Sequence, residues 1–246
     1  MKTTKIEWTD SSWNPVTGCT KVSDGCINCY AARMANRLCS MGNPRYKNNF
    51  NVTLHSDLLE QPYKLKRPTV IFVNSMSDLF HEKVPDDFIY SVFKVMNDNS
   101  HHIFQILTKR SHRLCTMNHD LSWSENIWMG VTVESNLYTD RIIDLRSTNA
   151  HVKFLSCEPL LGSIADADFS DIDWVVVGGE SGPGARLMRE EWVREIRDKC
   201  KQEEIAFFFK QWGGVRKRKN GRMLDNKEYN AMPHMIGDQV ISTAST

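Results

Sequence analysis

The chain has 246 residues, of which 41% are hydrophobic and 10% aromatic, enough for the core of one large domain or two small ones. Its formal net charge of +1 excludes a strongly basic or acidic protein that bulk charge would draw to a partner. No apolar run approaches the roughly 18 residues of a membrane span, and the amino-terminal residues do not have the pattern of a signal peptide. We therefore expect a cytoplasmic globular protein without a membrane partner, in which cysteines stay reduced.

Three of the seven cysteines fall within a loop that we expect over residues 14–31. Clustered cysteines in a reducing compartment bind a metal more often than they form a disulfide. A zinc site normally takes four ligands, and His55, Cys39 or a distant residue could supply the fourth. An iron–sulfur cluster held by three thiolates leaves one iron open for a substrate or a cofactor. Both alternatives remain open for the C-x6-C-x2-C spacing, which is formed by Cys19, Cys26 and Cys29.

Beyond the loop, six short apolar segments predict buried strands, with helix-like segments between them. The strand segments lack polar alternation, which is typical of strands covered on both faces, as in a parallel sheet. Together with a first strand just before Cys19, the alternation predicts an α/β fold, an incomplete (β/α) barrel of six or seven parallel strands. The predicted strands are residues 70–74, 103–107, 127–133, 152–155, 174–177 and 205–209, and the predicted helices are residues 86–96, 138–145 and 189–200.

We expect a main domain over residues 1–212 and a small carboxy-terminal appendage over residues 213–246. No repeat, low-complexity tract or long linker divides the chain earlier. The appendage contains the run RKRKNGR over residues 216–222, which predicts a basic hairpin around an Asn-Gly turn. Such a hairpin could bind phosphates, but a solvated turn is at least as plausible because the net charge is only +1.

In parallel α/β folds the functional residues collect at the carboxyl ends of the strands. Nearly every predicted strand ends in polar or ionisable residues. Helix capping explains any one of these ends but explains six in succession less well, so a shared pocket is favoured. The ends read NSMSD at 74–78, TKR at 108–110, TVES at 132–135, SCEP at 156–159, GGESG at 178–182 and KQW at 210–212.

Three residues at these ends are candidates because of their own chemistry. Cys157 could give a hydrogen atom to a substrate radical, although a buried cysteine is more often a small core residue. Lys210 follows an apolar strand and must reach water or meet an anion in the pocket. Trp212 offers a flat face to an adenine or a substrate base. We expect Lys210 and Trp212 to line a cavity for cofactor and substrate.

The cysteine loop also resembles that of a known group of enzymes. The lead-in NPVTGC and the exit CYA are similar to the cluster loop of radical S-adenosylmethionine (SAM) enzymes, most closely the spore photoproduct lyase branch. The first gap is three residues longer than in the usual C-x3-C-x2-C motif, and Asn28 stands where an aromatic residue is usual. With LTKR, SCEPLLG, VVVGGESG and FFKQWGG, almost the whole chain resembles a phage-encoded three-cysteine-motif family of unknown function.

This resemblance implies a radical SAM-like barrel that binds a [4Fe–4S] cluster and SAM. It implies that Cys19, Cys26 and Cys29 each ligate one iron. It also implies that the strand ending at Ser75, Ser77 and Asp78 contacts the SAM amino group, where a carboxylate would pair with the ammonium. The ribose hydroxyls would be bound by Glu134 and Ser135.

Two functional hypotheses follow. The first is a radical SAM enzyme of lyase or transferase type, which generates a 5′-deoxyadenosyl radical and abstracts hydrogen from a substrate. Kinship to a DNA-lesion enzyme makes nucleic acid or a nucleotide the expected substrate, by analogy of fold. The alternative is a non-catalytic phage accessory protein that binds zinc or an iron–sulfur cluster, and either a protein partner or nucleic acid. The resemblance further implies a dedicated partner protein and, for a phage-encoded chain, the host cytoplasm as location.

Overall fold

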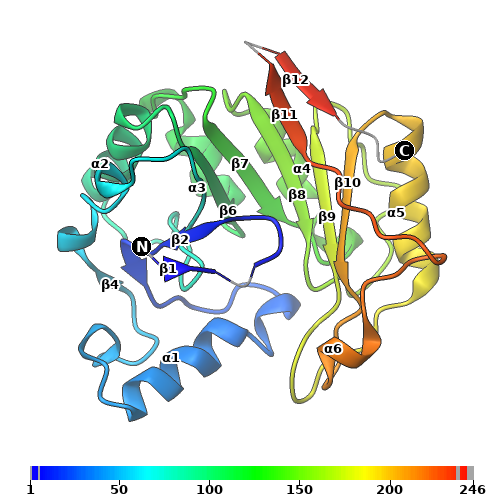
Figure 1. The fold of residues 1–246 in the computed structure, drawn as a ribbon, viewed down its shortest axis with the longest axis horizontal. Helices are drawn as coiled ribbons and strands as arrows, with labels where there is room; N and C mark the ends of the chain where they lie inside the picture. Colours follow the sequence, from blue (N-terminus) through cyan, green and yellow to red (C-terminus); the bar gives the residue numbers. More distant parts are fainter. Residues whose placement is uncertain (1, 5, 237–238, 243–246) are drawn as a thin grey trace. The chain divides into compact units, whose positions relative to one another are not determined.

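The computed structural model describes residues 2–4, 6–236 and 239–242 (Figure 1). The chain divides into two compact units. Unit 1 consists of Met1–Val22, Cys29–Met129 and Thr148–His151, and unit 2 consists of Ser23–Asn28, Gly130–Ser147 and Val152–Thr246. The predicted domain boundary at residue 212 therefore lies within unit 2, and the cysteine loop contributes to both units.

The main sheet has the strand order β1-β2-β5-β6-β7-β8-β9-β10, in which β1 and β10 are the two ends. Seven of these strands are parallel, whereas β1 pairs with β2 in the antiparallel direction. The predicted α/β class, an incomplete barrel of six or seven parallel strands, is confirmed. The strands are β1 Lys2–Thr3, β2 Ser11–Trp13, β5 Val70–Val73, β6 Ile103–Thr108, β7 Ile127–Thr132, β8 Val152–Cys157, β9 Trp174–Gly178 and β10 Ala206–Gln211.

Unit 1 is built on the parallel strands β2, β5 and β6. Trp13 of β2 is opposite Val73 of β5, which is opposite Ile106 of β6, and all three are completely buried. Helix α2 begins after Pro85 and buries one apolar face, formed by Ile89, Val92, Phe93, Val95 and Met96. The helices of unit 1 are α1 Tyr30–Ser40, α2 Asp86–Asp98 and α3 Ser111–Met117, and its 3-10 turns are η2 Pro44–Tyr46, η3 Ser56–Leu58, η4 Pro62–Lys64 and η5 Asn118–Asp120. A small sheet pairs β3 Val16–Thr17 with β4 Thr53–Leu54.

Unit 2 is built on the parallel strands β8, β9 and β10. All five residues of β9 are buried, as a strand covered on both faces requires. Helix α5 packs beside β10 and buries Val193, Ile196 and Cys200 (Figure 1). The other elements are η1 Asp24–Cys26, η6 Asn136–Tyr138, α4 Asp140–Arg146, α5 Glu190–Gln202, α6 Lys217–Asn220, β11 Pro233–Ile236 and β12 Gln239–Ser242.

The predicted basic hairpin at residues 216–222 is wrong, because the run forms the short helix α6. Gly213 and Gly214, with φ of 78° and 88°, turn the chain before this helix, and Gly221, with φ of 70°, follows its last residue. Lysine and arginine are good helix formers, so four such positions between glycine turns favour a helical turn over a strand. The antiparallel hairpin of this region is formed later, by β11 and β12.

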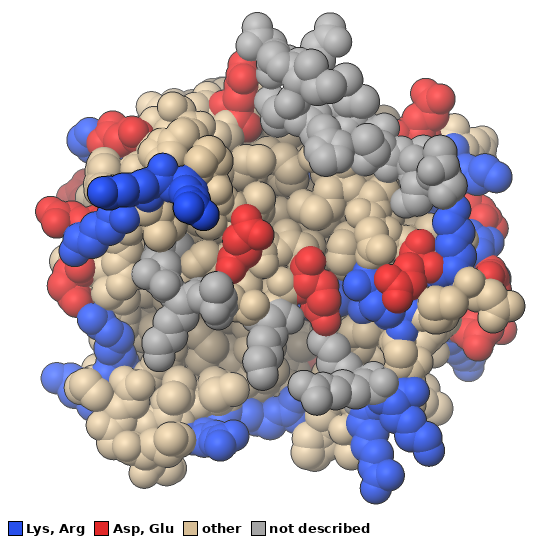
Figure 2. All heavy atoms as spheres, viewed as in Figure 1, with Lys and Arg blue, Asp and Glu red and all other residues tan. Residues whose placement is uncertain are grey.

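Among the residues that the structure describes, no helix combines the length and the apolar character needed to cross a membrane. Lys and Arg side chains are interspersed with Asp and Glu on the face shown in Figure 2. This mixture agrees with the net charge of +1.

Candidate functional site: a cysteine loop held by arginine–carboxylate pairs

The cysteine loop starts from β3, and the backbone around it places the first cysteine. Gly18 follows β3 with φ of 86°, and a Cβ at this position would overlap the carbonyl oxygen of Asn51, so only glycine fits. The Gly18 amide donates to the Met76 carbonyl at 2.9 Å, and the Cys19 amide donates to the Phe50 carbonyl at 3.1 Å. Cys19 is therefore held by main-chain contacts within unit 1.

The segment after β5, which we predict to contact SAM, contacts the lead-in of the loop. Ser77 Oγ donates to the Val16 carbonyl at 2.9 Å, and Ser75 Oγ donates to Asn14 Oδ1 at 3.2 Å. Asn74, with φ of 62°, accepts a hydrogen bond from the Val16 amide at 3.2 Å. Both serine hydroxyls thus anchor the lead-in, and their contact with SAM stays a prediction.

Asp78 is buried, and its carboxylate accepts four hydrogen bonds from the chain. Oδ1 accepts from the Thr108 hydroxyl at 2.7 Å and from the Phe80 amide at 3.0 Å. Oδ2 accepts from the Lys109 amide and from Arg110 Nη1, both at 3.1 Å. A ligand ammonium, as we predict for SAM, would have to share this carboxylate with Arg110.

Arg110 connects Asp78 with the first cysteine. Its side chain is only 9% exposed, and Nη1 lies 3.4 Å from Cys19 Sγ. The same guanidinium donates to Thr20 Oγ1 at 2.9 Å and to Glu82 Oε2 at 2.9 Å. Burial lowers the pKa of Arg110, but the negative charges of Asp78 and Cys19 and the hydrogen bond to Glu82 outweigh it. The net pKa is raised above the ordinary value, so the guanidinium remains charged.

The middle of the loop, Ser23–Asn28, belongs to unit 2 and rests on Glu134. Ser23 Oγ donates to the Glu134 carboxylate. A Cβ at Gly25 would overlap the same carboxylate, so glycine allows the turn η1 to approach it closely. This turn carries the second cysteine, Cys26.

Glu134 is completely buried and is paired with Arg141. Arg141 Nη1 lies 2.8 Å from Glu134 Oε2, and the guanidinium lies over the ring of Tyr138, 4.4 Å from the ring centroid. The Tyr138 hydroxyl in turn accepts a hydrogen bond from the Asp24 amide at 3.0 Å. Glu134 is therefore an anchor of the loop, and the predicted ribose contacts of Glu134 and Ser135 stay predictions.

A second pair in unit 2 holds the end of the same segment. Glu180 is 6% exposed and accepts hydrogen bonds from the Arg186 guanidinium at 2.6 and 3.0 Å. Asn28 Nδ2 donates to Glu180 Oε2 at 2.9 Å and to the Gly184 carbonyl at 3.0 Å. Arg186 also donates to the Asp24 carbonyl at 2.8 Å. Burial raises the pKa of Glu180, but the hydrogen bonds from Arg186 and Asn28 outweigh it and lower the pKa to about 2.

All three predicted ligands are cysteines of intermediate exposure that form no disulfide. Cys19 and Cys29 belong to unit 1 and Cys26 to unit 2. Cys26 Sγ lies 3.6 Å from Ser23 Oγ, and Cys29 directly precedes α1. Within the described ranges, no three His, Cys, Asp or Glu side chains form a group that could hold a metal ion. Ligation by the three cysteines stays a prediction.

Cys39 and His55 are the two residues considered as a fourth zinc ligand. Cys39 follows Cys29 by ten residues along α1, which at the rise of an α-helix places it about 15 Å away. His55 is buried, its Nε2 lies 2.8 Å from Thr17 Oγ1, and burial lowers its pKa. Cys39 is therefore too far from Cys29 to complete a four-ligand zinc site with it.

Cys157, the predicted hydrogen donor, ends β8 and is completely buried. Burial, with a smaller contribution from neighbouring Cys200, raises the pKa of its thiol well above the ordinary value. Such surroundings are those of a core cysteine. Its predicted role in hydrogen transfer is untested.

Lys210 and Trp212 lie at the end of β10. Lys210 Nζ is 2.9 Å from Glu158 Oε1, and the two side chains are 18% and 15% exposed. Trp212 Nε1 donates to the Met223 carbonyl at 2.9 Å, and its ring meets Phe209 edge-on, with centroids 4.8 Å apart. The anion beside Lys210 is thus a residue of its own unit, and the predicted contact of Lys210 and Trp212 with a ligand stays a prediction.

Four residues that hold the loop were assigned no role by the sequence, namely Arg110, Arg141, Glu180 and Arg186. Arg110 and Glu180 stood among the polar strand ends, as did Asp78 and Glu134, but Arg141 and Arg186 did not. Ser23 and Glu134 are 111 residues apart, and Asn28 and Glu180 are 152 residues apart. Pairs so distant along the chain leave no local pattern.

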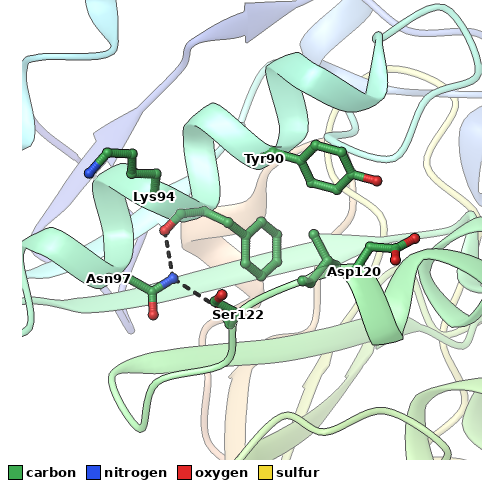
Figure 3. Close-up of a pocket in the computed structure, with 7 residues that line it drawn as sticks. Tyr90, Lys94, Asn97, Asp120 and Ser122 are labelled. Atoms are coloured by element: carbon green, nitrogen blue, oxygen red, sulfur yellow. Dashed lines mark hydrogen bonds between the residues drawn. The ribbon is translucent and has the colours of Figure 1, made fainter.

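A separate pocket of about 200 Å³ lies in unit 1, between α2 and the segment that follows α3 (Figure 3). The Asn97 amide bridges this pocket by donating to the Phe93 carbonyl at 2.8 Å and to the Ser122 carbonyl at 3.0 Å. Lys94, at its rim, pairs with Asp98 at 2.7 Å. None of the residues that line it is a predicted site residue, so the pocket is distinct from the cysteine loop.

Solved structures of spore photoproduct lyase are similar to the chain at low identity. The structure complexed with dinucleoside spore photoproduct has a TM-score of 0.48 at 12% identity, over 82% of this chain and 63% of that chain. A mutant structure with bound AdoMet and dinucleoside spore photoproduct has the same TM-score and coverage at 13% identity. The chain thus spans less than two thirds of the length of these enzymes.

No curated protein matches the chain. A family model described as "Protein of unknown function (DUF5131)" matches residues 3–233, which is nearly the whole sequence and includes the complete cysteine loop. The chain therefore belongs to the DUF5131 family.

Proposed function

We propose that the chain is a radical SAM-type iron–sulfur enzyme that acts on nucleic acid or a nucleotide. In this proposal Cys19, Cys26 and Cys29 hold a [4Fe–4S] cluster. The observation that carries it is the way the loop is held, since three arginine–carboxylate pairs with buried carboxylates contact it. Taking charges out of water is costly, and such groups concentrate at functional sites. A loop of ordinary structural purpose does not need them.

The chemistry of the donors fits the proposed group. Three cysteines in one loop, none of them in a disulfide, supply the soft ligands that an iron–sulfur cluster takes. The guanidinium that donates to Cys19 Sγ at 3.4 Å suits a sulfur that carries negative charge.

When bound, the cluster and SAM would supply a 5′-deoxyadenosyl radical for hydrogen abstraction. The residues of the chain bind and orient. Arg110 and Asp78 hold Cys19, while Glu134 and Glu180 hold the segment that carries Cys26. At the end of β10, the Lys210 cation suits a phosphate and the face of Trp212 suits a base.

Anaerobic reconstitution with iron and sulfide tests the proposal. We expect four irons per chain, absorbance near ~400 nm, and cleavage of SAM when the protein is reduced. Changing Cys19, Cys26 or Cys29 to alanine should abolish iron binding, each on its own.

Cys39→Ala and Cys115→Ala are the matched controls, and both should retain the iron. Stoichiometric zinc in protein purified without oxygen, lost in Cys39→Ala, would instead support the non-catalytic accessory protein. Full iron retention in any one of the three loop variants would remove that cysteine from the ligand set.

A further inference from the structure

Arg110 uses every donor that it has. A guanidinium carries five N–H groups in a fixed planar fork. Nε donates to Glu82 at 2.9 Å, and Nη2 donates to the hydroxyl and the carbonyl of Thr20 at 2.9 and 3.3 Å. Nη1 donates to Asp78 at 3.1 Å and to Cys19 Sγ at 3.4 Å. Five acceptors therefore match five donors, an arrangement that lysine cannot reproduce.

The acceptors differ in what they require of the arginine. Asp78 is 8% exposed and also accepts three further hydrogen bonds, so it fixes the guanidinium from the buried side. Glu82 is 61% exposed and can be served by water. Cys19 belongs to the cysteine loop and is a weak acceptor as a thiol, but a good one as a thiolate. The donor aimed at sulfur therefore gains most when Cys19 carries negative charge.

Hydrogen bonds to ligating sulfurs are among the factors that set the reduction potential of an iron–sulfur cluster. A donor that also carries a positive charge stabilises the reduced form, because reduction adds negative charge to the cluster and its sulfurs. Partners outside the ligand set also orient the ligand itself.

We propose that Arg110 is a positioning residue that fixes the sulfur of Cys19 and raises the reduction potential of the cluster held there. This inference rests on the proposed function, because it concerns the group that the three cysteines hold. It adds a residue outside the cysteine motif that controls how readily the cluster takes up an electron.

Arg110→Gln and Arg110→Lys test the inference, with Arg113→Gln as the matched control. Arg113 lies one turn further along α3 and donates to the Val84 carbonyl at 2.7 Å. After reconstitution without substrate, a redox titration followed by electron paramagnetic resonance gives the midpoint potential of each protein. We expect the midpoint of Arg110→Gln to shift to more negative potential, that of Arg110→Lys to lie between, and that of Arg113→Gln to equal the wild type.

Retention of iron is a second readout that is independent of turnover. Loss of a partner outside the ligand set typically weakens metal binding about 10- to 100-fold, so Arg110→Gln should lose iron to a chelator correspondingly faster than the wild type. Thermal unfolding shows whether each variant is folded. If Arg110→Gln does not fold, Arg110→Lys keeps the positive charge beside Asp78 and carries the test.

Failure of the proposed function and failure of this inference give different experimental results. A wild-type chain that takes up no iron overturns the proposed function and this inference together. A full cluster in every protein with coincident midpoints overturns the inference alone and leaves the proposed function standing. Lower thermal stability of the Arg110 variants without any change of potential would make Arg110 a packing residue, which also overturns the inference.

Discussion

The Arg186 guanidinium donates twice to the Glu180 carboxylate, at 2.6 and 3.0 Å, in a place where the carboxylate is almost completely buried. The backbone amide of Arg186 donates a third hydrogen bond at 2.9 Å. An anion with this many donors strongly resists protonation, which has a consequence for the acid stability of unit 2.

Glu180→Gln should make the free energy of unfolding less dependent on pH under acid conditions. Burial raises the pKa of Glu180, but its hydrogen bonds lower the folded value to about 2 from an ordinary value of 4.5. Because the folded pKa is depressed, ionised Glu180 stabilises the fold above pH 4.5, and this contribution is lost as the pH falls from 4.5 towards 2. Urea denaturation at several pH values in this window should show a steeper loss in the wild type than in Glu180→Gln. The exposed Glu191→Gln is the control, and equal slopes for all three proteins would contradict the prediction.

Gly25→Ala should displace the middle of the cysteine loop. The added methyl group would overlap the Glu134 carboxylate, which is completely buried and held by Arg141, so the carboxylate has little room to move. Overpacking of this kind costs about 1–3 kcal/mol of folding free energy. Ser23→Ala, which removes a donor to the same carboxylate without adding atoms, is the comparison. Chemical denaturation should give Gly25→Ala a lower free energy of unfolding than Ser23→Ala, and Gly25→Ala should take up less iron on reconstitution. The reverse order of stability would count against close packing at this position.

Lys210 and Glu158 should show a coupled effect on stability. Removing one partner of a buried pair leaves the other charge without compensation and costs about 3–5 kcal/mol; the residual exposure of 15–18% places this pair at the lower end. Lys210→Met alone should therefore be more destabilising than the double variant Lys210→Met/Glu158→Gln. Urea denaturation of the two single variants and the double variant measures the coupling as a double-mutant cycle. Additive effects would mean that the ion pair contributes nothing as a pair.

Cys157 should be inert to alkylation in the folded protein. Its thiol is completely buried, and burial raises its pKa, so both access and thiolate content are low at neutral pH. Iodoacetamide followed by mass spectrometry should label Cys39 in the native state and Cys157 only after denaturation. Rapid labelling of Cys157 in the folded chain would reveal an opening that a hydrogen donor to substrate needs, and would strengthen its predicted catalytic role.

The strands were predictable because β5 to β10 are covered on both faces and so consist of nearly continuous apolar residues. The segment predicted over 127–133 and the strand Ile127–Thr132 differ at one end only. The helix over 86–96 was equally visible, since α2 has an amphipathic pattern. The basic run at 216–222 was mispredicted because Gly213 and Gly214 already turn the chain before it, so the Asn-Gly pair ends a helix and does not form a hairpin turn.

The candidate site was predictable only in part. The cysteine motif is local and was found from its spacing, and the strand ends were recognised as polar. The pairs Arg110–Asp78, Arg141–Glu134 and Arg186–Glu180 depend on side-chain rotamers and on where the turns place each residue. Serine, asparagine and glycine at positions 23, 28 and 25 looked like ordinary loop residues, and their purpose is apparent only beside their carboxylate partners.

The amide of Asn28 reaches both the carboxylate at position 180 and the main chain at position 184. A phenylalanine at position 28 carries no hydrogen-bond donor and could make neither contact. Across an alignment of this family, positions 28 and 180 should therefore co-vary: homologues that keep asparagine should keep the glutamate, and homologues that replace one should replace the other. Asparagine before the third cysteine would then identify, from the sequence alone, the members of the family in which this asparagine and the glutamate at position 180 hold the loop.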